Sequence, residues 1–231
     1  MPFRCFKKNI ELILNNFVIF YNMKHLIPLT LFLALCCGLQ AQSNIPLPEP
    51  TFNMQMSLHK ALQLRQTERQ FTPEMMSLEQ LSTVLWMTYG YNRPDVKKRT
   101  APSARNVQET DVYVFLPEAV YLYNADSNML IFVAEGDHRR EISGQPHFAE
   151  APVALVLVAN YERMKGFDEK SIDFYSAVDC GYVSQNIYLG CTAMEMGTVA
   201  CGAIDRDAIA KILRLKNARA LLAHPVGFVA R

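Results

Sequence analysis

An excess of charge of one sign is what this 231-residue sequence most clearly lacks. Its 23 Lys and Arg residues stand against 22 Asp and Glu residues, a formal net charge of +1, and charged residues make up 19% of the chain. A surface that binds the phosphate backbone of nucleic acid needs an excess of basic residues, and a disordered chain has few apolar ones. The balanced charge argues against a nucleic-acid surface. The 50% of residues that are apolar argue against a disordered chain. The length suits one large domain or two small ones.

The common signatures of nucleotide, metal and hydrolase sites are also missing. The ten glycines form neither a G-x-G-x-x-G fingerprint nor a P-loop, so a Rossmann or P-loop site has no support. The sequence contains no H-E-x-x-H and no C-x-x-C, and it has no G-x-S-x-G nucleophile elbow. We therefore expect no metal ion and no ordinary hydrolase chemistry.

Residues 1–41 differ in kind from the rest of the chain. From Met23 the sequence has a short basic start, an apolar run over 26–38 and a small residue, Ala41, at a suitable cleavage position. The apolar run is shorter than the roughly 20 residues of a membrane span. This pattern predicts a secretory signal peptide, with residues 1–22 as a possible upstream extension from a misassigned start. We expect an exported protein, located in the periplasm.

Cysteine is scarce once this leader is removed. The mature chain keeps Cys180, Cys191 and Cys201, an odd number that suits buried thiols better than a disulfide framework. Removal also takes away four positive groups and one negative group, which leaves 19 against 21 and a net charge of −2. Lipid attachment at Cys36 or Cys37 is the less favoured alternative, because neither follows a small Gly, Ala or Ser.

The mature chain has helical and strand periodicities in irregular alternation, which predicts the α+β class. Residues 42–56 contain three prolines and predict an extended arm, and 90–110 predict a loop. We expect helices over 57–65, 77–89, 171–196 and 206–215, and extended segments over 111–116, 119–124, 129–134, 151–159, 198–203 and 219–229. The run over 151–159 is almost wholly apolar and predicts a central strand covered on both faces. The helix over 171–196 is apolar around most of its circumference and predicts burial on several sides, as between subunits.

Three polar segments point to chemistry. In the first, 65–71, the side chains of Arg65, Thr67 and Arg69 lie on a turn with free backbone N–H groups, a set that suits a phosphate dianion. A solvated helix end is the alternative interpretation. The second, 100–108, contains Pro102-Ser103-Ala104-Arg105-Asn106 and could also be an ordinary turn before a strand.

The third segment joins the long helix to a stretch of small residues. It contains Ser184-Gln185-Asn186 on the helix and then Ala200-Cys201-Gly202-Ala203. Small residues let a flat ring approach the main chain closely. A buried core role for Cys201 is favoured over a redox role.

Together these segments resemble the nitroreductase family of FMN oxidoreductases over 57–231, and more closely its SagB-type or azoline-oxidase-like branch. The motifs are similar to the family's R-x-S-x-R-x-F, its P-S-[SA]-x-N-x-Q loop, and its Gln-Asn helix followed by a G-L-G-T turn. The resemblance implies a central mixed or antiparallel sheet flanked by helices, with a long buried helix at the interface of a homodimer whose subunits share the flavin sites.

The resemblance also implies the roles of individual residues. The phosphate group of FMN would be bound by Arg65, Gln66, Thr67 and Arg69, with Arg231 as a further candidate. The loop residues Pro102, Ser103, Ala104 and Asn106 would reach the isoalloxazine ring of the neighbouring subunit. Gln145 would bond the pyrimidine edge, and backbone groups of Ala200, Cys201, Gly202 and Ala203 would face N5 and O4. No catalytic side chain is implied, because flavin N5 carries the chemistry.

The function implied is transfer of hydride or electrons from NAD(P)H, or another donor, to an organic acceptor such as a nitro or quinone compound. The Lys-Tyr pair of azoline-oxidising relatives is not recognisable, which argues against peptide azole formation. The mature histidines, among them His138, His147 and His224, have no recognisable carboxylate partner in the sequence and are expected to be solvated or structural. An exported flavin-binding protein without NAD(P)H turnover is the alternative function, and a purely structural role is a third possibility.

Overall fold

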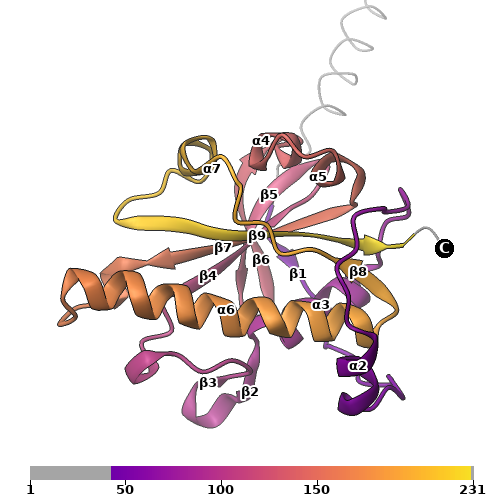
Figure 1. The fold of residues 1–231 in the computed structure, drawn as a ribbon, viewed down its shortest axis with the longest axis horizontal. Coiled ribbons are helices and arrows are strands. Elements are labelled where there is room, and N and C mark those ends of the chain that lie inside the picture. Colours follow the sequence, from indigo (N-terminus) through magenta and orange to yellow (C-terminus); the bar gives the residue numbers. More distant parts are fainter. Residues whose placement is uncertain (1–42, 230–231) are drawn as a thin grey trace, which may run out of the picture. The chain divides into compact units, whose positions relative to one another are not determined.

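A computed structural model describes residues 43–229, and one antiparallel sheet organises them (Figure 1). Its seven strands follow the order β1-β6-β5-β4-β7-β9-β8, and every pairing is antiparallel. The strands are β1 Ile45–Pro46, β4 Thr110–Phe115, β5 Ala119–Asn124, β6 Met129–Glu135, β7 Val153–Asn160, β8 Met196–Thr198 and β9 Ala218–Phe228. The expected α+β class is confirmed, and the sheet is antiparallel rather than mixed.

Helices cover both faces of the sheet (Figure 1). One face packs against α3 (Leu78–Tyr89) and the long α6 (Glu169–Ala193), with α2 (Leu58–Leu64) beside the C-terminal part of α6. The other face is covered by the short helices α4 (Arg139–Ile142) and α5 (His147–Glu150) and by α7 (Arg206–Leu213).

Strand β7 confirms the expectation of a central strand buried on both faces. Leu155 and Leu157 belong to the core that contains α3 and α6 side chains, whereas Val156 and Val158 belong to the core beneath α5 and α7. Because side chains alternate along a strand, a continuous apolar run supplies both cores at once.

Helix α6 is buried along one side only in a single chain. Asp168 caps its N-terminus by accepting a hydrogen bond from the Ser171 N–H at 3.0 Å, so the helix begins earlier than the apolar periodicity predicts. Its buried stripe faces the sheet, while Phe174 is 62% and Tyr182 is 49% exposed. Burial on a second side would therefore require another chain.

Two segments expected to lack sheet structure contribute short strands. The arm over 42–56 is extended, as expected, but Ile45–Pro46 is an edge strand of the main sheet, paired with β6, and Leu47 is buried beside it. The segment 90–110 contains a small hairpin of β2 (Tyr91–Arg93) and β3 (Lys98–Arg99), and two single-turn 3₁₀ helices, Pro94–Val96 and Ala104–Asn106. The turn signals of Gly, Asn and Pro hid the hairpin, whose strands of two or three residues are too short to show a period. The strand β1 is equally short, and its partner β6 is distant in sequence.

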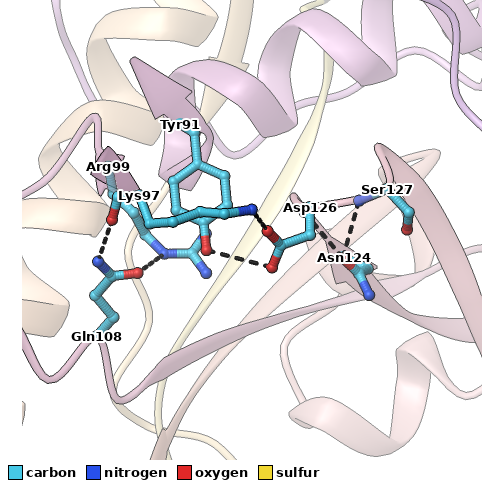
Figure 2. A network of polar contacts seen from close by, with 7 residues as sticks. All are labelled: Tyr91, Lys97, Arg99, Gln108, Asn124, Asp126 and Ser127. Atoms are coloured by element: carbon cyan, nitrogen blue, oxygen red, sulfur yellow. Dashed lines mark hydrogen bonds and ion pairs between the residues drawn. The ribbon is translucent and has the colours of Figure 1, made fainter. Parts of the chain in front are cut away.

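Figure 2 shows how this hairpin is fixed to the main sheet. Lys97 pairs with Asp126 in the β5–β6 turn, and the Tyr91 hydroxyl donates to the same carboxylate at 3.4 Å. Arg99 donates through Nε to Gln108 Oε1 at 2.8 Å, while Gln108 Nε2 donates to the Lys97 carbonyl at 2.7 Å. The hairpin therefore holds the end of the 100–108 loop.

The signal-peptide and lipidation predictions fall on residues outside the described range, as does Arg231. Within 43–229, no helix combines the length and the apolar character needed to cross a membrane.

Candidate flavin site

The Arg-rich turn after α2 runs alongside strand β8. The Glu68 N–H donates to the Thr198 carbonyl at 2.9 Å, and Phe71 forms an antiparallel bridge with Val229. Gly197 makes this approach possible, since a Cβ at that position would lie 2.3 Å from Val229 Cγ1 and 2.7 Å from Glu68 Cβ. The turn is thus attached to the sheet by its backbone.

The predicted phosphate ligands on this turn differ in their surroundings. Arg65 is half-buried with its guanidinium 5.0 Å from the centre of the Tyr188 ring, and Arg69 is exposed. Gln66 Nε2 donates to Glu68 Oε1 at 2.5 Å. Among residues 43–229, the backbone N–H groups of Gln66, Thr67 and Arg69 have no acceptor. The turn therefore presents positive charge together with free donors.

The small-residue segment after β8 lies beside this turn. The Ala200 N–H donates to the Tyr188 hydroxyl at 2.9 Å, and Cys201 exchanges two backbone hydrogen bonds with Ala223. Gly202 and Ala203 are exposed, and their N–H groups find no acceptor within the described part of the chain. Of the four predicted backbone positions, these two have donors available for a ligand.

Gln145 joins the same region from the other side of the sheet. Its Nε2 lies 3.5 Å from the Ala203 carbonyl, which also accepts from the Ser143 hydroxyl at 3.0 Å. Two residues further on, His147 Nε2 lies 3.6 Å from Cys201 Sγ. The segments around 65–69, 143–147 and 200–203 therefore meet at one place.

Two titratable groups at this place keep their neutral forms. Burial lowers the pKa of His147, and the nearby Arg69 charge lowers it further. Burial also raises the pKa of the Cys201 thiol, which the Arg69 charge partly opposes. The interpretation of Cys201 as a buried thiol agrees with this environment, because the reactive form of cysteine is the thiolate.

The 102–106 loop lies elsewhere in the chain. The Ala104 N–H donates to Asp179 Oδ2 at 2.7 Å, and Asp179 precedes Tyr188 by nine residues on α6, about 13 Å along the helix axis. Arg105 and Asn106 adopt positive φ angles of 51° and 59°. Within a single chain, the 102–106 loop therefore lies apart from the segments around 65–69, 143–147 and 200–203.

A buried pair of carboxyl groups beneath this loop was missed by sequence reasoning. Glu109 is 0% and Asp179 is 4% exposed, and neither Glu109 oxygen has a hydrogen-bond partner among the described residues. Burial raises the pKa of Glu109 to about 7, and the neighbouring Asp179 charge also raises it. The sequence signal that could have revealed this pair is Asp179, an acidic residue among the buried residues of α6.

Sequence reasoning also missed Tyr188, which contacts both the 65–69 turn and the 200–203 segment. Behind it lies His224, fully buried, with Nε2 2.9 Å from Ser184 Oγ and Nδ1 3.2 Å from Thr198 Oγ1. Burial lowers the pKa of His224 to about 3, so the ring is neutral. A tyrosine on an apolar helix gives no sequence signal for such a role.

The expectation for the histidines needs one correction. His138 Nδ1 lies 2.7 Å from Glu141 Oε1, a carboxylate partner three residues further on. The helix α4 brings them together, although the sequence around them carries no strong helical periodicity. Within 43–229, no group of three or more His, Cys, Asp or Glu side chains could hold a metal ion.

Comparison with known proteins identifies the class. The model of the nitroreductase family matches residues 62–228. The crystal structure of a protein described as a nitroreductase from Ralstonia eutropha is 33% identical, covers 83% of this chain and 92% of its own, and superposes with a TM-score of 0.78. The chain therefore belongs to the nitroreductase family, and it is a nitroreductase-family oxidoreductase with that family's fold.

Two further relatives agree with this assignment. A protein named as a nitroreductase in Methanocaldococcus jannaschii is 29% identical over 184 residues, 75% of this chain and 91% of its own. The microcin synthetase complex of E. coli contains a chain 17% identical to this one, with coverage of 80% and 77% and a TM-score of 0.64. At that identity the last likeness concerns the fold.

Proposed function

We propose that the protein is an FMN-dependent oxidoreductase that passes electrons from NAD(P)H, or another donor, to an organic acceptor such as a nitro or quinone compound. The convergence of the Arg65–Arg69 turn with Gly202 and Ala203 supports this most directly. The turn provides positive charge and free backbone N–H groups at one end of the candidate site. Gly202 and Ala203 provide two further N–H groups at the other end. When bound, FMN supplies hydride acceptance and donation at N5.

The donor set at the turn fits a phosphate dianion. Two guanidinium groups with the N–H groups of Gln66, Thr67 and Arg69 provide charge-assisted donors for several phosphate oxygens. The Thr67 hydroxyl adds another donor. A turn of a merely solvated helix end would not need the close attachment to β8 through Glu68 and Gly197.

The opposite end fits a flat ring. Gly202 has open space, because a Cβ there would have Leu222 Cδ2, at 3.8 Å, as its nearest neighbour. The exposed amide N–H groups of Gly202 and Ala203 can donate to acceptor atoms on a ring edge. Gln145 lies close enough to the Ala203 carbonyl for its amide to serve the same ligand.

We further propose a homodimer in which the 102–106 loop serves the flavin of the second copy. The separation of this loop from the converging segments and the exposed Phe174 and Tyr182 on α6 support this arrangement. A stable monomer in sizing chromatography with light scattering would contradict it.

The absorbance spectrum of the purified mature protein tests the proposed function. We expect a yellow protein whose visible flavin band is bleached by NADH or NADPH and restored by an acceptor. A colourless protein that FMN cannot reconstitute would refute the proposal. A yellow protein that neither nucleotide bleaches would favour the alternative, an exported flavin-binding protein without NAD(P)H turnover.

Export and branch membership remain parts of this proposal. The signal-peptide pattern supports a periplasmic location, and mass spectrometry of the native protein should find its first residue near Gln42.

The SagB-type or azoline-oxidase-like branch is supported by the sequence motifs and by a fold shared with the microcin synthetase complex. Lipidation at Cys36 or Cys37 would appear as an added acyl mass.

A further inference from the structure

Tyr188 on α6 contacts three predicted residues of the flavin site, which belong to two of its segments. Its hydroxyl accepts from the Ala200 N–H at 2.9 Å and lies 3.2 Å from Thr67 Oγ1. Its ring is covered by the Arg65 guanidinium at 5.0 Å from the ring centre. The turn and the small-residue segment are therefore joined through one side chain that belongs to neither of them.

The donors present fix the direction of one of these two hydrogen bonds. A backbone N–H can only donate, so the Tyr188 oxygen is the acceptor toward Ala200. The bond between the Tyr188 and Thr67 hydroxyls can run in either direction. When Tyr188 donates, Thr67 keeps its own proton for a ligand, and Ala200, Tyr188 and Thr67 form a chain in which each bond polarises the next.

The Tyr188 ring is held by groups independent of this chain. The His224 ring meets it edge-on, with centroids 5.7 Å apart and an interplanar angle of 81°. His224 is in turn fixed by Ser184 and Thr198. Because Thr198 also accepts the Glu68 N–H through its carbonyl, the support of the ring and the attachment of the turn share the strand β8.

We propose that Tyr188 is a positioning residue of the flavin site: its hydroxyl sets the Thr67 donor and the phosphate-binding turn relative to the segment that begins at Ala200. This inference rests on the proposed function. Tyr188 acts on the ligand through Thr67 and Ala200.

The variant Tyr188→Phe tests this, because it removes the hydroxyl and keeps the ring between Arg65 and His224. The Kd for FMN, titrated into apoprotein, should rise about 3- to 10-fold, the effect of one hydrogen bond. The visible circular dichroism of bound FMN at saturation should change, and the Ala200 amide of the apoprotein should exchange faster. A purely structural role would change neither the saturated spectrum nor Ala200 selectively.

The matched control is Tyr182→Phe, on the same helix and 49% exposed. It should leave FMN affinity, spectrum and Ala200 exchange as in the wild type. If wild type binds FMN and Tyr188→Phe matches it in affinity and spectrum, the role of Tyr188 is refuted while the proposed function stands. If wild type and control both fail to bind FMN, both proposals fail.

A double-mutant cycle provides a second test. Thr67→Val removes the other hydroxyl of the chain, and each single substitution should weaken FMN binding. Because both break the same chain, Tyr188→Phe in the Thr67→Val background should add less than a twofold further loss. Fully additive losses would show that Tyr188 does not act through Thr67.

Discussion

Two of the regions that carry predicted flavin ligands are built in different ways. The turn at 65–69 is held to β8 and Tyr188 by neutral hydrogen bonds and a tight glycine contact, and it leaves its guanidinium groups available. The 102–106 loop is held by the buried acid Asp179, with Glu109 beside it. The first region is expected to be insensitive to pH, whereas the second depends on protonation. The two regions therefore differ in the interactions that hold them in place.

The largest effect should come from removing the charges of the first region. Arg65→Ala and Arg69→Ala should each raise the Kd for FMN about 10- to 150-fold, because hydrogen bonds to charged groups contribute about 1.5–3 kcal/mol. Fluorescence titration of apoprotein measures this, with Lys170→Ala, on the exposed start of α6, as control. Unchanged affinity in both variants would show that the phosphate site is elsewhere.

Gly197→Ala should break the attachment of the turn to β8. The new Cβ would overlap Val229 and Glu68, and overpacking of this kind costs about 1–3 kcal/mol of unfolding free energy. Chemical denaturation measures the loss. Gly144→Ala is the matched control, since a Cβ there meets no atom within 4 Å. Equal stability of the two variants would contradict the close contact.

The second region should make stability depend on pH. The pKa of Glu109 is raised from 4.5 to about 7, chiefly by burial, with the Asp179 charge raising and the Arg163 charge lowering it. Between these values the folded state holds a proton that the unfolded state releases. The free energy of unfolding should therefore fall as pH rises from about 4.5 to about 7, because ionisation places a charge in the interior.

The variant Glu109→Gln should flatten this part of the profile, because its amide can donate to Asp179 at every pH. Urea unfolding at pH 5 and at pH 7.5 provides the measurement. Glu118→Gln, at an exposed position, should keep the slope of the wild type. An unchanged slope in Glu109→Gln would mean that other groups produce the pH dependence.

The smallest effect is expected at the surface of the hairpin. Lys97 and Asp126 are 64% and 55% exposed, so solvent screens their attraction. Lys97→Ala should leave the thermal midpoint unchanged within error, whereas Arg99→Ala should lower it, because Arg99 stacks at 4.4 Å on both Tyr89 and Tyr91. Differential scanning calorimetry compares the two. Equal shifts would indicate that charge, rather than stacking, holds the hairpin.

Much of the fold could be predicted because long elements carry clear periodicity. The continuous apolar run of β7 predicted its two-sided burial, and the helix expected over 77–89 is α3, whose start is fixed by the capping box of Ser77 and Gln80. The short elements β1, β2 and β3 could not be predicted in this way. Two or three residues contain no period, and β1 in addition pairs with residues such as Leu130, far away in the chain.

The candidate site also has a part that local sequence predicts and a part that only packing decides. By itself, the neutral composition argued against a nucleic-acid surface, and local motifs predicted the family and the flavin ligands at 65–69, 102–106 and 200–203. The tertiary structure alone decided that Tyr188 joins the turn to Ala200 and that Glu109 meets Asp179. These residues lie 70 to 121 positions apart or on an apolar helix, and only packing against the sheet brings their polar atoms together.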